Sequence, residues 1–551
     1  MNDINKLFIV NGKGNVWDLK DPNYRDEKIL HTTSEYQKYW NKIKNGENFM
    51  LFRYGDGERM LMCGQKVRAQ EGWTAPEYIT ELGKALQDTL KPSKNVDRSK
   101  IIYAITCPCC NSEIYFWYLQ NLTPKTTVTS ANIWINDNFK HFKKDFVELE
   151  RDAVLITNYR GKGKQFGKLN IKKHYVVDDD CVNFWERESK KLIKQIIDEV
   201  GNENNLLFAF SAGPLSEPIM LELFKHNPNN CYIDFGSALN FIIHEGITRP
   251  FMLENNALSK KQCWIFNNSQ LDLNVDVLLT AYKRPQVLAQ QLEAIKNQTI
   301  KPKNILLYQD GIDSYYKIEL NKMFLRQFSD YHIAKENTGV WQRFVYASKA
   351  AKSKYVCVFD DDTIPGPRWL ENCYIHMQQS KGIYGTNGIL LRNGVNYPSR
   401  DMLVAGWHSA NEKIAEVDFV GHSWFVERDY LKYMAKKPYI KDYKYVGEDM
   451  CLSYSCQEHD IFTYVPPHPL DNIPLWGSLP QYGQKYGSNE VALSVNSVHL
   501  ADMRKILAQM RNDGWKLLCE RNDQYVQSCV PELSRRVIYK SNVRSQQPVA
   551  K

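Results

Sequence analysis

The sequence contains no uninterrupted apolar segment that approaches the roughly 18 residues needed to cross a bilayer. Its first residues, MNDINKLFIVNGKGN, do not show the basic stretch followed by an apolar one that is typical of a secretory signal. It also has no run of Lys and Arg with interleaved aromatic residues, which would indicate a nucleic-acid surface. We therefore expect a cytoplasmic protein that binds no nucleic acid and whose only membrane contact would be peripheral.

A second zinc-ligand pair is also missing. Cys107, Cys109 and Cys110 lie close together, but no further pair of ligands follows at the spacing of a zinc site. The 13 cysteines are odd in number and scattered, which is typical of reduced thiols in the cytosol. We therefore expect free thiols at this cluster rather than a metal.

The chain has 551 residues, which is too long for one ordinary core and predicts at least two domains. Hydrophobic residues make up 43% of it, so it is globular rather than disordered. Lys and Arg number 71 against 63 Asp and Glu, a mild excess that fits anionic ligands or an anionic membrane surface. We predict five segments: a lead-in at 1–33, a domain at 34–258, a linker at 259–273, a second domain at 274–500, and a C-terminal helix with a basic tail at 501–551.

The first domain alternates short apolar strands with helices, which predicts an α/β fold with a mostly parallel sheet. An apolar strand at 49–52 runs directly into RYGDGE at 53–58, whose glycines let the backbone approach a ligand closely. Asp56 and Glu58 are candidates for binding a metal or a sugar hydroxyl, and Arg53 is a candidate for pairing with a phosphate. The alternative is an ordinary acidic turn after a strand.

A second loop of interest, Ser211 to Pro214, joins a strand at 206–210 to a helix for which Ser216 is the expected N-cap. The backbone N–H groups at such a helix start form a cradle for phosphate, although an ordinary strand-to-helix turn has the same pattern. A further strand at 231–236 carries an acid near its end.

Three motifs of this domain, RYGDGE (53–58), FSAGPLSEP (210–218) and IDFGSALN (233–240), resemble the D-type glycosyltransferase fold. The resemblance covers about residues 35 to 255 and implies a Rossmann-like nucleotide-sugar-binding domain. It implies that Asp56 and Glu58 lie at the nucleotide-sugar and metal site. It also implies that the loop from Ser211 to Gly213 lies near the phosphates of the nucleotide.

The most informative stretch of the second half is Tyr355 to Pro365, YVCVFDDDTIP. Its five β-forming residues predict a strand buried on both faces, and this strand ends in Asp360, Asp361 and Asp362. Ligands of open α/β sheets bind at the carboxyl ends of the strands. Because adjacent carboxylates repel one another, such a site usually holds a hard cation such as Mg²⁺ or Mn²⁺. The alternative is an exposed acidic turn.

Two earlier strands of this half also end in polar residues. The strand at 275–280 is followed by a turn containing Arg284, and the strand at 305–308 is followed by Asp310. This order of strands and helices predicts a nucleotide-binding half-sheet. We therefore expect Arg284 and Asp310 to point into one crevice with the three aspartates.

Five motifs in order resemble the family 2 glycosyltransferases with an A-type fold. They are LLTAYKRP (278–285), QDG (309–311), FDDD (359–362), DFVGHSWFV (418–426) and VGEDMCLS (446–453). The resemblance covers about residues 274 to 475 and implies a second Rossmann-like domain. The nucleotide-sugar contacts that it implies come from Thr280, Tyr282, Arg284, Asp310 and Asp361.

The same resemblance assigns the metal and the catalytic base. It implies that Asp360 and Asp362 hold the metal bound to the diphosphate, and that Asp449 is the base with Glu448 beside it. His499 is a candidate for a further metal ligand, against the alternative of an inconsequential histidine at a helix start.

The chemistry of sugar transfer explains these residue types. A departing nucleoside diphosphate gains negative charge, which a divalent cation can neutralise. The acceptor hydroxyl has a pKa far above neutral, so a carboxylate such as Asp449 takes its proton, in a single displacement that inverts the anomeric carbon. Trp407, Trp424 and Phe425 are candidates for stacking on sugars, although core packing is the more common fate of such residues.

Together these patterns predict a bifunctional glycosyltransferase. It would move sugars from nucleotide-diphosphate donors, with UDP-sugars foremost, onto a glycan or lipid-linked oligosaccharide. Two alternatives stay open: a single A-type activity with the first domain as a scaffold or acceptor-binding module, and a non-catalytic carbohydrate-binding protein. A nucleotidyltransferase is disfavoured because no glycine-rich basic loop lies near the first strand.

Overall fold

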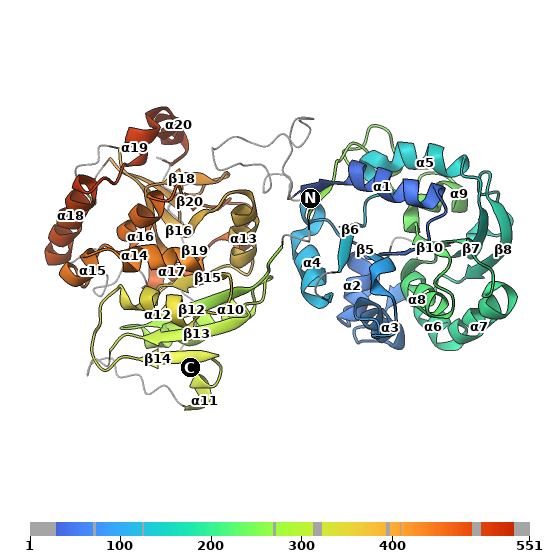
Figure 1. The fold of residues 1–551 in the computed structure, drawn as a ribbon, viewed down its shortest axis with the longest axis horizontal. Helices are drawn as coiled ribbons and strands as arrows, with labels where there is room; N and C mark the ends of the chain where they lie inside the picture. The colour runs from blue at the N-terminus through green and yellow to red at the C-terminus, as the bar shows by residue number, and fades with distance from the viewer. Residues whose placement is uncertain are drawn as a thin grey trace, which may run out of the picture. The chain divides into compact units, whose positions relative to one another are not determined.

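The computed structural model describes residues 29–69, 73–123, 126–267, 271–311, 322–392, 397–399, 401–407, 409–486 and 497–533. The chain divides into two compact units, with the boundary between Leu271 and Asp272 (Figure 1). Part of the stretch predicted as a linker is structured, because Trp264–Phe266 forms strand β11. Among the described residues, no helix is both long enough and apolar enough to span a bilayer.

The first unit, to residue 271, is built on a seven-stranded sheet in which every pair of neighbouring strands is parallel. The prediction of a mostly parallel sheet is therefore confirmed. The strand order is β6-β5-β2-β10-β9-β7-β8. The bounds are β2 (Met50–Arg53), β5 (Ile101–Ile105), β6 (Thr127–Ser130), β7 (Asp152–Asn158), β8 (Asn170–Val177), β9 (Leu207–Ser211) and β10 (Cys231–Asp234).

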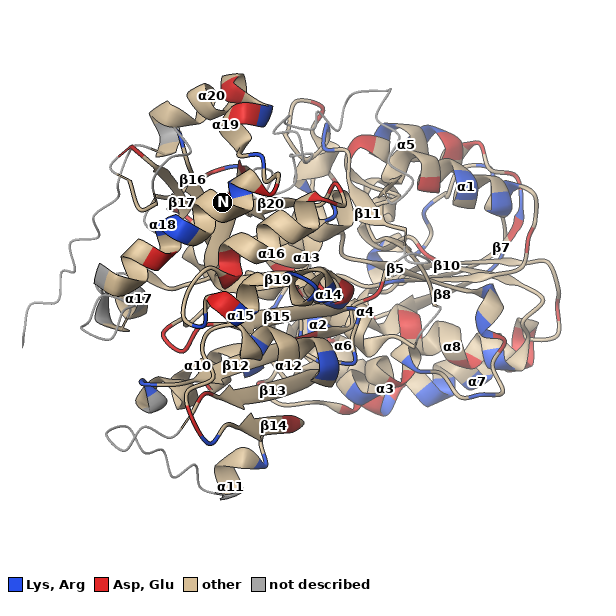
Figure 2. Ribbon diagram, turned by 60° about the vertical axis from the view of Figure 1, so that its left-hand side comes forward, with Lys and Arg blue, Asp and Glu red and all other residues tan. Residues whose placement is uncertain are grey.

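Helices cover both faces of this sheet, which is why its central strands read as continuous apolar runs (Figure 1). They are α1 (Thr32–Lys44), α2 (Asp56–Met62), α3 (Glu81–Leu90), α4 (Pro108–Asn121), α5 (Phe139–Val147), α6 (Cys181–Arg187), α7 (Ser189–Val200), α8 (Ser216–His226) and α9 (Asn240–Ile243). The outer helices α1 and α7 each carry Lys together with Asp or Glu, so neither helix has charge of one sign only (Figure 2).

Two local predictions in this unit are wrong. The apolar spacing of residues 184–200 predicts one amphipathic helix, whereas two helices, α6 and α7, form and meet at Glu188, whose φ is −118°. Ser216 is the first residue of α8 rather than its N-cap. Its hydroxyl instead accepts from Ala212 N and donates to Asp234, so it links β9 to β10.

A two-stranded ladder joins the two ends of the described first unit. Strand β1 (Ile29–His31) pairs antiparallel with β11. The neighbouring Thr32 donates to the carbonyl oxygen of Cys263 from its backbone N–H and from its hydroxyl, at 2.9 and 3.0 Å. A further small ladder pairs β3 (Val67–Arg68) with β4 (Thr74–Ala75).

The second unit has a mixed sheet in the order β14-β13-β12-β15-β19-β16-β20-β18, with β17 pairing to β16. The half formed by β14, β13, β12 and β15 is parallel, as predicted for a nucleotide-binding half-sheet. The bounds are β12 (Val275–Ala281), β13 (Asn304–Gln309), β14 (Asp330–Ile333), β15 (Tyr355–Phe359), β16 (Gly382–Leu390), β17 (Leu403–Gly406), β18 (Ala415–Val417), β19 (Phe419–Glu427) and β20 (Phe462–Val465).

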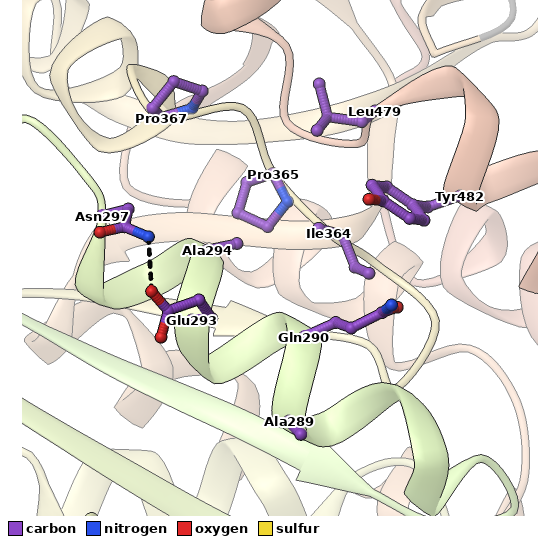
Figure 3. A pocket seen from close by; sticks show the side chains of 10 residues that line it. All are labelled: Ala289, Gln290, Glu293, Ala294, Asn297, Ile364, Pro365, Pro367, Leu479 and Tyr482. Carbon is purple, nitrogen blue, oxygen red and sulfur yellow. Dashed lines mark hydrogen bonds between the residues drawn. The ribbon is translucent and has the colours of Figure 1, made fainter.

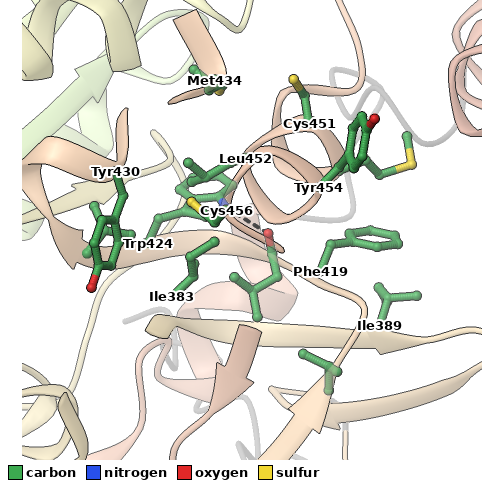
Figure 4. Packing of buried hydrophobic residues seen from close by; sticks show 14 of the residues in the cluster. Ile383, Ile389, Phe419, Trp424, Tyr430, Met434, Cys451, Leu452, Tyr454 and Cys456 are labelled. Carbon is green, nitrogen blue, oxygen red and sulfur yellow. Dashed lines mark hydrogen bonds between the residues drawn. The ribbon is translucent and has the colours of Figure 1, made fainter. Parts of the chain in front are cut away.

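A large apolar core fills one side of this sheet. Side chains of β16 and β19, such as Ile383, Ile389 and Phe419, pack against Leu452 and Tyr454 of α16 (Figure 4). The helices of the unit are α10 (Leu288–Lys296), α11 (Lys322–Leu325), α12 (Gln342–Ala350), α13 (Trp369–Gln379), α14 (Leu431–Ala435), α15 (Tyr439–Asp442), α16 (Glu448–Gln457), α17 (Pro480–Tyr486), α18 (Ser497–Asn512), α19 (Leu518–Arg521) and α20 (Asp523–Leu533).

The predicted C-terminal helix forms earlier in the chain than expected. The apolar spacing after residue 500 predicts a helix over 503–518, whereas α18 ends at Asn512 and the chain turns at Gly514, whose φ of +113° favours glycine. Ile506, Leu507 and Met510 of α18 belong to the core of the second unit. The basic tail predicted to follow lies outside the described residues.

Candidate active site

The loop after β15 places three carboxylates at the carboxyl edge of the second sheet. All five residues of β15 are buried, and Asp360 follows immediately, so the predicted strand and its acidic end are confirmed. Gln291 of α10 holds this loop in place, because its Nε2 donates to the carbonyl oxygens of Asp360 and Thr363, each at 2.7 Å. A buried side chain therefore fixes the carboxylates at a defined position.

Arg284, from the turn after β12, joins this carboxylate cluster as predicted. Its Nη1 donates to Asp361 Oδ1 at 2.7 Å and lies 3.6 Å from Asp362 Oδ2. The other carboxylate oxygen of Asp361 is buried and has no hydrogen-bond partner among the described residues. Burial raises the pKa of Asp361 to about 6, against the opposing effect of Arg284.

Arg343 of α12, which sequence reasoning did not single out, connects two sides of the site. Its Nη1 donates to Asp360, and its Nη2 donates to Glu448 Oε1 at 3.0 Å. The guanidinium also lies over the rings of Phe344 and Trp424, with its carbon 5.2 and 5.0 Å from their centroids. One buried cation therefore ties the acidic loop after β15 to the start of α16.

Glu448 and Asp449 are the first two residues of α16, where the helix dipole favours negative charge. The chain reaches this start through Gly447, whose φ of +89° is in the left-handed region. A Cβ at this position would lie 2.3 Å from Ile506 Cδ1 of α18, so any larger residue would require this side chain to shift. Asp449 Oδ1 accepts from the N–H of Met450 at 2.7 Å.

The two acids differ in their protonation. Burial and the neighbouring Asp449 raise the pKa of Glu448 to about 8, although Arg343 acts in the opposite direction. Burial raises the pKa of Asp449 to about 6, and its hydrogen bond from Met450 limits the rise. Both carboxyls therefore have raised pKa values, and the rise is smaller for Asp449, which suits Asp449 rather than Glu448 to the role of a general base.

The residues expected to hold the nucleotide lie at the ends of β12 and β13. Asp310 Oδ1 accepts from the backbone N–H of Thr338 at 2.6 Å and from its hydroxyl. The hydroxyl of Tyr282 accepts from Asn337 Nδ2 at 2.7 Å. The hydroxyl of Thr280 is buried and has no partner among the described residues. Asp310 and Tyr282 thus both bind the segment that precedes α12.

The structure offers a histidine that the sequence prediction missed. Asp360, Asp362 and His422 each present a ligand atom within 4.8 Å of the others, and His422 Nδ1 lies 3.8 Å from Asp362 Oδ1. An irregular register between β16 and β19 and a φ of +67° at His422 direct its side chain to this place. His499, the predicted ligand, lies against Tyr445 at 5.7 Å between ring centroids, and its metal role stays a prediction.

Of the three aromatic candidates for sugar stacking, two lie in the core and one lies beside His422. Trp424 and Phe425 are buried in the core, as the more common fate predicts. Trp407 is only partly buried, and its ring lies 4.9 Å from that of His422. Trp407 is therefore the one of the three that lies partly exposed beside His422.

Part of this site lies in a region that matches a known protein family. Residues 276–433 match the family model for glycosyl transferase family 2. The matched glycosyl transferase family 2 domain contains the aspartates, Arg343 and His422, while Glu448 and Asp449 lie beyond its end. The match supports glycosyltransferase activity, with a nucleotide-sugar donor and a glycan acceptor. No curated protein significantly matches the chain.

A second candidate site lies in the first unit, outside the glycosyl transferase family 2 domain. A cavity of about 720 Å³ opens at the carboxyl ends of the parallel strands, the usual binding edge of such sheets. The cavity brings together all five residues predicted there: Arg53, Asp56, Glu58, Ser211 and Gly213. Further charged residues line it that sequence reasoning did not single out, among them Arg160, Asp179 and Arg249.

The carboxylates of the first site also serve the local fold. Asp56 Oδ1 accepts from the N–H of Gly57 at 3.0 Å, and Glu58 Oε2 accepts from that of Gly55 at 2.8 Å, so both carboxylates cap the start of α2. Arg53 Nε donates to Ala131 O at 3.0 Å. Asp56 and Glu58 belong to none of the three-ligand groups found among the described residues.

Two buried acids lie deeper in this site. Burial raises the pKa of Asp234 to about 7, with Arg53 opposing the rise, and burial together with Asp234 raises the pKa of Glu217 well above its usual value. One carboxylate oxygen of Glu217 is buried without a partner among the described residues. The acid expected near the end of the strand at 231–236 is Asp234, whereas Glu217 was not singled out although it stands in the motif FSAGPLSEP.

A third hollow, of about 490 Å³, runs along the outer side of α10 in the second unit. Figure 3 shows the apolar side chains of Ile364, Pro365 and Leu479 around it, with one hydrogen bond from Asn297 to Glu293. It contains none of the predicted site residues, so it plays no part in the catalytic assignment.

Proposed function

We propose that the second unit is a metal-dependent, inverting glycosyltransferase that uses a nucleoside-diphosphate sugar. The observation that carries this proposal is the link that the buried Arg343 makes between the Asp360, Asp362 and His422 group and Glu448, the neighbour of Asp449 at the start of α16. The match to glycosyl transferase family 2 supports the reaction class.

The donor set at the edge of the sheet fits a hard divalent cation. Two carboxylates and an imidazole, with an unpartnered oxygen of Asp361 nearby, suit Mn²⁺ or Mg²⁺. Asp360, Asp362 and His422 would hold the ion, which would neutralise the charge of the leaving diphosphate. Arg284 lies beside the same carboxylates and supplies a fixed positive charge there.

Other residues of the chain provide proton transfer and nucleotide binding. Asp449 takes the proton of the acceptor hydroxyl, because its pKa is raised less than that of Glu448. Glu448 pairs with Arg343, whose positive charge offsets that of a carboxylate beside the base. Asp310, Tyr282 and Thr280 bind the base and ribose at the ends of β12 and β13. We propose UDP as the nucleotide, which a donor panel tests directly.

A panel of nucleotide sugars tests this proposal on the full chain. With Mn²⁺ present, we expect one donor to release its nucleoside diphosphate, and we expect Asp362→Asn and Asp449→Asn to slow this release about 10²–10⁴-fold. Glu293→Gln, in the hollow along α10, is the matched control and should keep wild-type turnover. Release at the wild-type rate in Asp449→Asn would contradict the assigned base, and no turnover of any donor would favour a carbohydrate-binding protein.

We propose a second donor site in the cavity of the first unit, which would make the chain bifunctional. Its position at the carboxyl edge of a parallel sheet supports this, as do the convergent Arg53, Asp56 and Glu58. The capping contacts of Asp56 and Glu58 favour the alternative, a scaffold or acceptor-binding module.

Paired variants distinguish these readings. In the bifunctional case Asp56→Asn with Glu58→Gln abolishes one transfer, and Asp360→Asn with Asp362→Asn abolishes the other. If both pairs remove the same single transfer, the chain has one active site. Titration of nucleotide sugars into the full-length Asp360→Asn, Asp362→Asn protein then shows whether the first cavity binds a donor.

We propose a hydroxyl group of a growing glycan, free or lipid-linked, as the acceptor. Trp407, beside His422, is the aromatic surface best placed to bind a sugar face. Mass spectrometry of products formed from free and lipid-linked oligosaccharides tests the acceptor class. Trp407→Ala should raise the KM for the acceptor more than that for the donor.

A further inference from the structure

Four cysteine sulfurs converge in the first unit. Cys107, Cys109, Cys110 and Cys263 each place their Sγ within 4.8 Å of the other three. The Sγ of Cys110 lies 3.8 Å from that of Cys263, and the Sγ of Cys109 lies 3.3 Å from that of Cys107. Four thiolates around one zinc ion, each about 2.3 Å from it, lie about 3.8 Å apart, so the observed cluster has the size of a tetrahedral site.

The fold brings the four cysteines from two distant places. Cys107 precedes α4 at the end of β5, and Cys109 and Cys110 lie in the first turn of that helix. Cys263 lies just before β11, and its carbonyl oxygen is held by Thr32. This separation explains why the sequence showed three clustered cysteines without a further ligand.

Amide groups around the cluster are oriented for thiolates. Asn132 Nδ2 lies 3.4 Å from the sulfurs of Cys107 and Cys110 and 3.5 Å from that of Cys263. Asn136 Nδ2 donates to the sulfur of Cys263 at 3.2 Å. Such N–H donors around ligating atoms are typical of the outer shell of a metal site. Sulfur is a poor acceptor when neutral, so donors converging on one cluster favour ionised ligands.

Charge and burial also fit a structural metal. Four thiolates around one Zn²⁺ carry a net charge of minus two, and Lys261 supplies a cation beside them through its bond to Cys109 O at 3.0 Å. Three of the cysteines are buried and Cys110 is partly buried. A closed set of four protein ligands is the pattern of structural rather than catalytic zinc.

We propose that Cys107, Cys109, Cys110 and Cys263 bind one structural Zn²⁺ ion. The ion clamps the start of α4 to the strand β11 and so joins the middle of the first unit to its end. It also stiffens one wall of the 720 Å³ cavity, because Cys110, Asn132 and Asn136 line that cavity. The proposal does not depend on whether the cavity binds a donor.

Zinc content of the full chain tests this proposal. The protein is purified without a histidine tag and dialysed briefly against EDTA to strip weakly held cations. We expect one zinc per chain by elemental analysis, released when a mercurial reagent blocks the thiols. Growth with cobalt should give the visible absorption of tetrahedral cobalt bound by thiolates. Zinc-free wild-type protein, or two disulfides among the four cysteines, would overturn the proposal.

Variants assign the ion to the cluster. Cys263→Ser should lose the zinc, whereas Cys63→Ser, in the same unit but outside the cluster, should keep it. Asp360→Asn with Asp362→Asn should also keep it, which separates this ion from any cation of the second unit. If Cys263→Ser does not fold, Asn136→Ala provides the second test and should speed zinc loss to a chelator, and full zinc in a soluble Cys263→Ser protein would refute the assignment.

Discussion

Replacing Arg343 with methionine tests the central connection of the second unit. Methionine keeps much of the buried apolar volume but removes both charge-assisted bonds, to Asp360 and to Glu448. Each such bond contributes about 1.5–3 kcal/mol, and breaking a buried ion pair from one side costs about 3–5 kcal/mol. Because Glu448 can take up a proton and Asp360 is partly exposed, we expect a loss of about 3–5 kcal/mol rather than the sum.

The loss of folding stability in this variant should increase with pH. The pKa of Glu448 in the folded protein, about 8, already lies above its ordinary value of 4.5, and removal of Arg343 raises it further. An acid whose pKa is raised by folding destabilises the folded state increasingly as pH rises above its unfolded pKa. The Arg343→Met variant should therefore lose more folding stability, relative to the wild type, at about pH 9 than at about pH 6.

Hydrogen exchange of the full chain, followed by mass spectrometry, measures this loss. Because the chain has two units, a single unfolding midpoint is not well defined, whereas peptides from β15 and α16 report on the second unit alone. Lys354→Met is the control, since its pair with Glu427 at 3.8 Å is partly exposed and contributes at most about 1 kcal/mol. Equal protection in the two variants would refute the bridging role of Arg343.

Three further changes probe the same site. Asp449→Asn should lower kcat about 10²–10⁴-fold in a diphosphate-release assay. Wild-type activity should fall as pH drops through about 6, where Asp449 takes up its proton. Gly447→Ala should destabilise the second unit by about 1–3 kcal/mol in hydrogen exchange, because of its positive φ and its contact with Ile506, and Ile506→Val should relieve part of this. Gln291→Leu should cost about 1–3 kcal/mol and weaken Mn²⁺ binding in calorimetry, since two buried carbonyls lose their donor.

The sequence was most informative where apolar runs end abruptly. The strand at 355–359 and its acidic end were predicted to the residue, because a fully buried strand leaves a continuous apolar pattern and aspartates cannot continue it. The same reasoning placed Arg284 beside the aspartates, since the ends of neighbouring parallel strands meet at one edge.

Contacts between segments that are far apart in the sequence were not predicted. Arg343 lies in a helix whose pattern shows only an apolar face, and nothing local marks its partners on β15 and α16. His422 stands in a strand, and only the backbone irregularity at that point directs it to Asp362. Cys263 joins the other three cysteines through the pairing of β1 with β11, which spacing along the chain cannot reveal.

The pairing of β1 with β11 determines when the first unit can complete its folding during synthesis. Thr32 and Cys263 are separated by 231 positions, so their contact waits until almost the whole first unit has left the ribosome. Closing a loop of this length costs about 5 kcal/mol of chain entropy, by the logarithmic dependence on length. The three residue pairs between β1 and β11 offset little of this entropy cost by themselves. The seven-stranded sheet must therefore form first and hold the two ends near each other. The two ends of the described first unit then lie side by side. A unit connected in this way can be inserted into, or cut from, a longer chain.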